Sequence, residues 1–215
     1  MRLFGFPHCG GQENIYGAWS RGLPSRFRFE TVELKEASRL GWNPSSQAWT
    51  QAVEEAGIYI ASAMDGAGGG VYGLIGHCSG GLLAFEASHW LKACGMQEPA
   101  HLFVSGCSPP HLLQAQARPD LGTGPSDPAL FPDACRMAEA YRMPSGRGPL
   151  LSRLSVFAGR RDPGVHVDSL AEWGRYTARI CDVHIGEGEH AGWGHDADHW
   201  LQFVQMIMER EYPSS

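Results

Sequence analysis

The amino-acid sequence predicts an α/β fold in which a mostly parallel central sheet is flanked by helices. Short apolar runs alternate with longer stretches of helical periodicity, and a Gly-x-Cys-x-Gly turn joins one such run to one such stretch. Strands that alternate with helices build a parallel sheet that is covered on both faces. The length of 215 residues suits one domain with a substantial core, so we expect a single domain over residues 1–215.

Six strands are expected because six runs are short and rich in apolar or β-branched residues. Such runs are typical of strands buried on both faces of a parallel sheet. They are Arg2 to Phe6, Phe27 to Leu34, Val71 to Ile75, His101 to Ser105, Leu154 to Ala158 and Ile180 to Ile185.

Three helices are indicated by their end signals. The first begins at Asn43-Pro44, where an N-cap residue precedes a proline at the first helical position, and runs to Met64. The second covers Gly80 to Ala93 and stops near Cys94-Gly95, a frequent C-terminal signal. The third covers Ala197 to Glu211.

A proline-rich insertion interrupts the alternation between the fourth and fifth strands. Eight of the fourteen prolines lie between Pro109 and Pro149. A long insertion within a compact domain is typically a lid or a binding loop. We therefore expect residues 107–150 to form a lid insertion, with one short helix around Asp133 to Met143.

Composition excludes several function classes. The formal net charge is −6, and no cluster of Lys and Arg indicates a nucleic-acid surface. No apolar run is long enough to span a membrane, and the N-terminus lacks the pattern of a signal peptide. The six cysteines form no CxxC pair, so we expect free thiols and a cytoplasmic location. No cofactor is expected, and the default oligomeric state is a monomer.

The stretch Gly76-His77-Cys78-Ser79-Gly80 has the spacing of a catalytic turn between a strand and a helix. In such a turn the central residue has a cramped backbone conformation, and the glycines let strand and helix approach closely. Its side chain projects above the carboxyl edge of the sheet, where free N–H groups of the helix stabilise a thiolate. Cysteine alone would favour a buried packing residue, but the strand-turn-helix context favours Cys78 as the nucleophile.

An orienting acid and a general base should follow the nucleophile in that order along the chain. Asp162 lies just beyond the strand-like run LSVFAG, and His190 lies in the loop after the last strand. Both would reach the sheet edge that Cys78 occupies. In such a triad, His190 takes the proton of the thiol and later activates water, while Asp162 holds the tautomer of the ring.

Other side chains compete for the roles of acid and base. Asp168 is expected to begin a helix, whereas Asp182 and His184 lie within the last strand. His77 neighbours the nucleophile and is expected to point into packing.

The run HDADH, residues 195–199, resembles a set of metal ligands with His190 nearby. Asp196 and Asp198 are better explained as first-turn acids at a helix N-terminus. We therefore expect no metal site.

Two N–H donors should stabilise the oxyanion of an acyl intermediate. One belongs to the residue after the nucleophile, Ser79, and the other to a loop after a neighbouring strand. The loop Pro7 to Gly11 follows the first strand, and it faces the turn at Cys78 if the second and third strands lie on opposite sides of the first. Taken alone, this loop is more typical of an ordinary βα turn.

Five segments, in order over nearly the whole chain, carry a family resemblance: RLFGFPHCGG, GHCSGG, LFVSGCSPP, VFAGRRDP and a final Gly-x-His loop. Together they resemble the type II thioesterases, stand-alone α/β-hydrolases that serve nonribosomal peptide and polyketide assembly lines. The resemblance implies the α/β-hydrolase fold and hydrolysis of acyl or aminoacyl groups from the phosphopantetheine arm of a carrier protein. It also implies that the segment after Ser105 is a lid over the acyl pocket.

Carried over residue by residue, the resemblance assigns the nucleophile to Cys78, the acid to Asp162 and the base to His190. The oxyanion donors would be the N–H groups of Ser79 and Cys9. The implied partners are an acyl or peptidyl carrier protein and a small-molecule acyl thioester, with neither a nucleic acid nor a membrane.

The chain departs from the family pattern at the nucleophile, where serine is usual, and after the histidine, where Ala191-Gly192 replace the usual aromatic residues. A cysteine exchanges one thioester for another at little energetic cost, so the acyl group stays activated. It could then pass to water, an amine, an alcohol or a thiol. The sequence ranks a thioesterase first, a Cys-dependent acyltransferase or condensing enzyme second, and a non-catalytic docking protein third.

Overall fold

A parallel sheet forms the centre of the structure, a computed structural model that describes residues 1–6, 16–17, 19–34, 46–116, 141–189 and 197–213. Within these residues, six strands form the sheet in the order β2-β1-β3-β4-β5-β6, and every neighbouring pair is parallel. The strands are β1 (Arg2–Phe6), β2 (Arg28–Thr31), β3 (Tyr72–His77), β4 (His101–Ser105), β5 (Arg153–Gly159) and β6 (Cys181–Gly186). The predicted α/β class is therefore confirmed.

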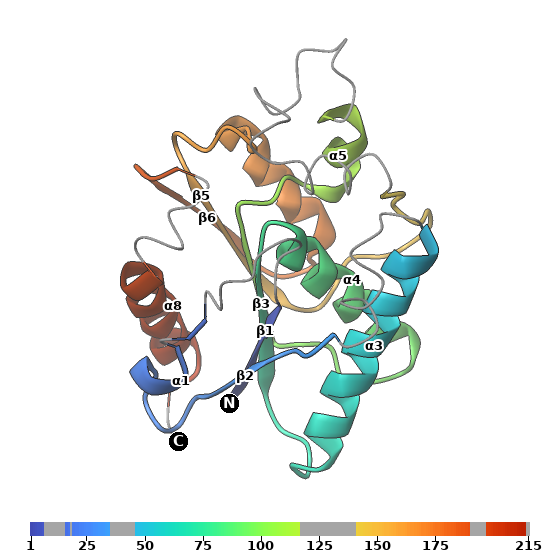
Figure 1. The fold of residues 1–215 in the computed structure, drawn as a ribbon, viewed down its shortest axis with the longest axis vertical. Coiled ribbons are helices and arrows are strands. Elements are labelled where there is room, and N and C mark those ends of the chain that lie inside the picture. Colours follow the sequence, from blue (N-terminus) through green and yellow to red (C-terminus); the bar gives the residue numbers. More distant parts are fainter. Residues whose placement is uncertain (7–15, 18, 35–45, 117–140, 190–196, 214–215) are drawn as a thin grey trace.

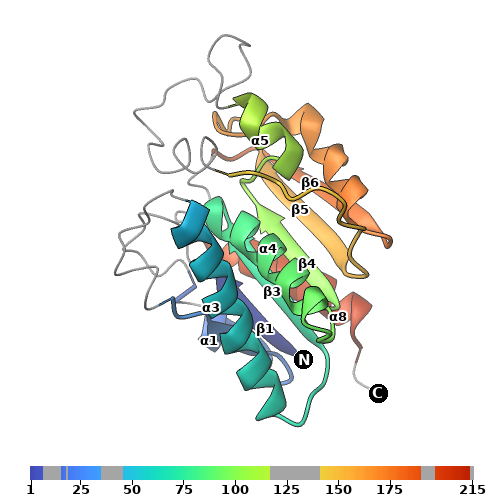
Figure 2. The ribbon, with the colours of Figure 1, turned by 90° about the vertical axis from the view of Figure 1, so that its right-hand side faces the viewer.

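Helices cover both faces of this sheet. They are α1 (Trp19–Gly22), α3 (Ser46–Asp65), α4 (Ser79–Ala93), α5 (Pro110–Gln116) and α8 (Ala197–Glu211), with the 3-10 helix η2 (Val167–Tyr176). Figures 1 and 2 show α3 and α4 side by side on one face, and α1 and α8 on the other. None of the described helices is both long and apolar enough to cross a membrane.

Successive side chains of a strand point to opposite faces of the sheet, so the strands contribute to two separate hydrophobic cores. Phe4 and Leu74 pack with α3 and α4, whereas Leu3 and Ile75 pack with α1 and α8. β1 and β4 lie inside the sheet and are buried at nearly every position, and both have the predicted bounds.

The prediction for β2 was too long at its carboxyl end. β2 lies at the sheet edge and ends at Thr31, whereas the apolar run continues to Leu34. Val32 and Leu34 are buried against the core although they lie outside the strand. Apolar content therefore marked burial here rather than strand pairing.

The strand order changes direction at β1, since β2 lies on one side of β1 and β3 on the other. This confirms the predicted topological switch, and ligands of open α/β sheets bind outside the carboxyl ends of the strands at such a point. The carboxyl ends all meet at one edge, uppermost in Figure 1.

Part of the predicted lid, residues 107–150, lies outside the described residues, as does most of the helix expected around Asp133 to Met143. The last residues of that predicted helix, 141–143, are described and are not helical. Pro144 follows them, and the residue before a proline is disfavoured in the α-helical region. The prediction of a helix up to Met143 was therefore wrong.

β3 and α4 approach each other closely because glycines line their contact. A Cβ atom on Gly76 would lie 2.2 Å from the carbonyl oxygen of Gly80, far inside van der Waals contact. One on Gly81 would lie 3.1 Å from a methyl carbon of Val104 on β4. The glycines of the predicted turn therefore set the distance between strand and helix.

We expect Gly76→Ala to destabilise the fold, because the added methyl group would push α4 away from β3. Overpacking of this kind costs about 1–3 kcal/mol, and urea unfolding followed by circular dichroism would measure it. Gly186→Ala is the matched control, since a Cβ atom there meets nothing within 4 Å. Equal unfolding midpoints for the two variants would contradict the role of this contact.

Candidate active site

Cys78 is the one residue between the end of β3 and the start of α4. Its backbone has φ 53° and ψ −124°, and no other described non-glycine residue has a positive φ. Such a conformation costs about 1–3 kcal/mol and persists only where the surrounding structure imposes it. Here the N–H of Cys78 donates to the carbonyl oxygen of Ser105 at 2.8 Å, and the carbonyl oxygen of Cys78 accepts from Gly81 at 3.0 Å. The turn thus has the cramped backbone that its spacing predicts.

The thiol of Cys78 is half-buried at the N-terminus of α4. Ser79, the predicted oxyanion donor, is the first residue of that helix and is buried. The N–H groups of a helix N-terminus favour negative charge, whether on a thiolate or on an oxyanion. The position therefore suits both the nucleophile and the charge that develops on a substrate.

A second thiol, that of Cys107, lies beside this turn. Cys107 follows β4, is buried, and its Cβ atom would lie 3.4 Å from a Cβ atom placed on Gly81. Burial raises the pKa of the Cys107 thiol far above its usual range, and the charges of Cys78 and Asp162 raise it further. Cys107 therefore stays protonated at neutral pH. Cys78, Cys107 and Asp162 follow β3, β4 and β5, which are neighbouring parallel strands, so all three lie at the same edge of the sheet.

Asp162 lies three residues beyond β5, and only 7% of its surface is exposed. Its N–H donates to the carbonyl oxygen of Gly159 at 3.1 Å, and its Oδ1 accepts from the N–H of Gly164 at 2.8 Å. The turn is thus closed around a buried carboxylate, which is the environment that an orienting acid requires.

The two competing aspartates are placed differently. Asp182 is the second residue of β6, at the opposite, amino end of the strands, where its Oδ2 pairs with Arg153 at 2.9 Å. Asp168 is exposed in the first turn of η2, so it begins a helix as predicted. Neither has the buried position at the carboxyl edge that Asp162 occupies.

The predicted base, His190, and the predicted second oxyanion donor, Cys9, lie outside the described residues, as does the whole loop Pro7 to Gly11. Their roles stay predictions. The structure describes the chain up to Glu189, however, and so locates the approach to the base.

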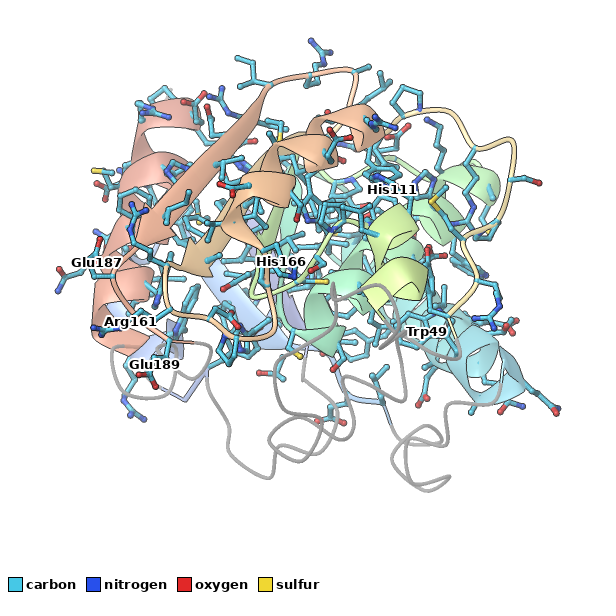
Figure 3. The ribbon with its side chains drawn as sticks, turned by 90° about the horizontal axis from the view of Figure 1, so that it is seen from above. Trp49, His111, Arg161, His166, Glu187 and Glu189 are labelled. Atoms are coloured by element: carbon cyan, nitrogen blue, oxygen red, sulfur yellow. The ribbon has the colours of Figure 1, made fainter. Side chains whose placement is uncertain are left out.

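The loop after β6 is held against the loop after β5. The N–H of Arg161 donates to the carbonyl oxygen of Gly188 at 3.1 Å, and a Cβ atom on Gly159 would lie 2.1 Å from that same oxygen. Figure 3 shows Arg161 next to Glu189, the last described residue before position 190. The chain therefore comes to the predicted base directly beside the turn that carries Asp162.

The two described histidines that compete as bases both serve packing. His77 is 5% exposed, and its Nδ1 lies 3.3 Å from the hydroxyl oxygen of Ser105. His184 stacks on Phe157 with ring centroids 4.9 Å apart, and burial lowers the pKa of its ring. The interpretation of His77 as a packing residue is thus supported by its contacts.

Among the described side chains, no group of three or more His, Cys, Asp or Glu could hold a metal ion. The run HDADH at 195–199 falls outside that search, because its residues or their side chains are not described. The expectation that this run binds no metal stays a prediction.

Sequence reasoning missed Cys107 and Trp173 as parts of the site. The buried indole of Trp173 donates to the carbonyl oxygen of Cys107 at 3.0 Å, so η2 is fastened to the segment that lies beside the turn at Cys78. Cys107 could have been found, because it follows β4 at the edge where β3 also ends. Trp173 carried no signal, because its contact joins residues that are 66 positions apart.

Comparison with known proteins identifies the family, because the model of the thioesterase domain matches residues 1–143, more than half of the chain. The chain belongs to the thioesterase domain family. Linear gramicidin dehydrogenase LgrE of Brevibacillus parabrevis is 23% identical over 235 residues, which cover 96% of this chain and 87% of that protein.

Among solved structures, ClbQ from the colibactin NRPS/PKS pathway matches with a TM-score of 0.74 and 21% identity, covering 97% of each chain. The RedJ thioesterase from the prodiginine biosynthetic pathway of Streptomyces coelicolor matches with a TM-score of 0.70 and 25% identity, covering 95% of this chain and 84% of that one. The predicted α/β-hydrolase fold is confirmed by these likenesses.

We expect Cys78→Gly to unfold at a higher urea concentration than Cys78→Ala, because only glycine adopts φ 53° and ψ −124° without strain. The expected difference is about 1 kcal/mol, since the backbone entropy that glycine loses on folding offsets part of the relieved strain. The reference exchange is Ala61→Gly within α3, which should destabilise by about 1 kcal/mol. A Cys78→Gly protein less stable than Cys78→Ala would show that the turn is not strained.

Proposed function

We propose that this protein is a type II thioesterase that hydrolyses acyl or aminoacyl thioesters held on the phosphopantetheine arm of a carrier protein, in natural-product biosynthesis. The observation that carries the proposal is the strained turn at Cys78, which presents a thiol at a helix N-terminus in a chain of the thioesterase family. The buried carboxylate of Asp162 at the same edge supports a triad with His190 as base. The pathways named for ClbQ and RedJ support the biosynthetic setting.

In the acylation step, His190 takes the proton of the Cys78 thiol, and the sulfur attacks the carbonyl carbon of the thioester. The N–H groups of Ser79 and Cys9 stabilise the negative charge that develops on the carbonyl oxygen. The bond to the carrier sulfur then breaks, and His190 returns the proton to that leaving sulfur. Asp162 keeps the imidazole in the required tautomer and stabilises its protonated form.

In the deacylation step, His190 takes a proton from water, whose oxygen attacks the acyl carbon on Cys78. Collapse of the intermediate breaks the bond to the Cys78 sulfur, which regains a proton, and releases a free carboxylic acid. Cys107 does not compete for the acyl group, because the thiolate is the nucleophile and burial keeps this thiol protonated.

A second candidate is an acyltransferase or condensing enzyme, and the cysteine at position 78 is the observation that favours it. An acyl group on sulfur stays activated, so an amine, an alcohol or another thiol can replace water as the acceptor. The exclusion of water during deacylation would then decide the product. A non-catalytic docking protein on the same scaffold is a third candidate, and it would lack an activated thiol.

We expect an acyl-pantetheine thioester to leave an acyl mass adduct on the wild-type protein, detected by intact-protein mass spectrometry. Cys78→Ala should leave no adduct and should lower turnover by about 10⁴-fold or more, because no nucleophile remains. Cys94→Ala, at an exposed cysteine in the C-cap of α4, should keep both.

The decay of this adduct separates the three candidates. Loss in buffer alone indicates the hydrolase, and loss only after addition of an amine or a carrier thiol indicates the acyltransferase. A wild-type protein with neither adduct nor turnover, whose Cys78 reacts with iodoacetamide no faster than Cys94, would leave the docking protein as the explanation.

We expect Asp162→Asn to lower kcat by about 10²–10⁴-fold, because the asparagine no longer holds the correct tautomer of the base. His190→Ala should lose at least as much. Asp168→Asn is the matched control and should be near wild type, since Asp168 is exposed in η2. A larger loss of kcat in Asp168→Asn or Asp182→Asn than in Asp162→Asn would move the acid to that residue.

A further inference from the structure

A cavity of about 470 Å³ lies between α3, α4 and residues 141–148, in the size range of small-molecule sites. Most of its lining is apolar and includes Trp49, Val53, Trp90, Tyr141 and Pro144. Neither Cys78 nor Asp162 lines it. Glu86, the first lining residue on α4, lies eight residues after Cys78, which is about 12 Å along a helix that rises 1.5 Å per residue. The cavity is therefore separate from the nucleophile.

The view onto the carboxyl edge agrees with this separation. Figure 3 shows Trp49 on the opposite side of the molecule from Arg161 and Glu189, whose loops adjoin the candidate triad. A ligand held in the cavity by its polar end would thus keep that end away from the reacting sulfur.

His89 lines the cavity as a buried polar side chain. Only 7% of its surface is exposed, and its ring packs edge-on to Phe85 with centroids 4.7 Å apart. Within the described part of the chain, no hydrogen bond engages its ring nitrogens. Burial, then the charges of Arg147 and Lys92, lowers the pKa of His89 to about 4, so the ring is neutral at neutral pH. A neutral imidazole offers one N–H donor, which is available to a ligand in the cavity that the ring lines.

Positive charge exceeds negative charge around the cavity. Among the described residues that line it, the charged ones are Glu86, Lys92, Arg142 and Arg147. Glu86 is 4% exposed and is already engaged, since Oε1 accepts from the Tyr141 hydroxyl and Oε2 from Arg147, each at 2.7 Å. Lys92 pairs with Glu98 at 3.0 Å, but Glu98 does not line the cavity. In a chain of net charge −6, this lining favours a ligand with an anionic end.

We propose that this cavity is a second binding site for an amphipathic carboxylic acid. The carboxylate accepts the N–H of His89 among the charges of Lys92 and Arg147, and the apolar body lies against Trp49 and Trp90. The choice of a carboxylic acid rests on the proposed function, because a free acid is the product of thioester hydrolysis. The phosphopantetheine arm also carries an anionic phosphate, but its two amides suit this mostly apolar lining less well.

The test is calorimetric titration of the Cys78→Ala protein with decanoate. Decanoate should bind saturably at one site, and 1-decanol, which lacks the anionic end, should bind at least tenfold more weakly. His89→Phe keeps a ring but removes the N–H, and it should weaken decanoate binding by about tenfold or more, as for any lost hydrogen bond to a charged group. His184→Phe, at a stacked histidine away from the cavity, is the matched control and should bind like the parent.

A second variant covers the case that His89→Phe does not fold. Ala93→Phe adds a ring at an exposed lining position in the last turn of α4, and it should also weaken decanoate binding at least tenfold.

The proposal is overturned if decanoate does not bind saturably, if neither cavity variant weakens decanoate binding, or if 4′-phosphopantetheine binds more tightly than decanoate. It is also overturned if decanoate protects wild-type Cys78 from iodoacetamide, since the acid would then occupy the nucleophile's own site. Because binding is measured without the nucleophile, a chain that binds decanoate but has no turnover would refute the proposed function and leave this site standing.

Discussion

The contact between the backbones of Gly76 and Gly80 is the constraint on which the rest of the candidate site depends. With no side chain between them, β3 and α4 meet after a single intervening residue, and that residue must turn the chain through a positive φ. Cys78 therefore sits where its thiol meets the N-terminal end of α4. Its N–H bond to Ser105 fastens the turn to β4, so the strand that holds Cys78 in place is also the strand that Cys107 follows.

The parallel sheet brings the other groups to this turn without any local sequence relation between them. Every strand ends at the same edge, so the loops after β3, β4 and β5 meet there. A second glycine contact, between Gly159 and the carbonyl oxygen of Gly188, aligns the loop that carries Asp162 with the loop that leads to position 190. One close backbone approach thus orders the turn at Cys78, and a second brings together the loop of Asp162 and the loop that leads to position 190.

The parts of this arrangement that depend on local pattern could be predicted, and those that depend on distant contacts could not. β1 and β4 are mostly apolar and are buried at nearly every position, so both were predicted to the residue, and the turn at Cys78 was predicted from its glycine spacing. At the edge strand β2 the same criterion failed, because Val32 and Leu34 are buried without pairing. The support that Trp173 gives to Cys107, and the cavity between α3, α4 and residues 141–148, join segments that share no motif.

α4 extends from Cys78 to the cavity. The buried carboxylate of Glu86 on this helix binds Tyr141 and Arg147, which line the cavity on the other side. The carboxylate of Glu86 is buried and accepts hydrogen bonds from the hydroxyl of Tyr141 and the guanidinium of Arg147, each at 2.7 Å, so both residues are held on this helix. The helix that begins directly after Cys78 therefore also holds Tyr141 and Arg147 in place.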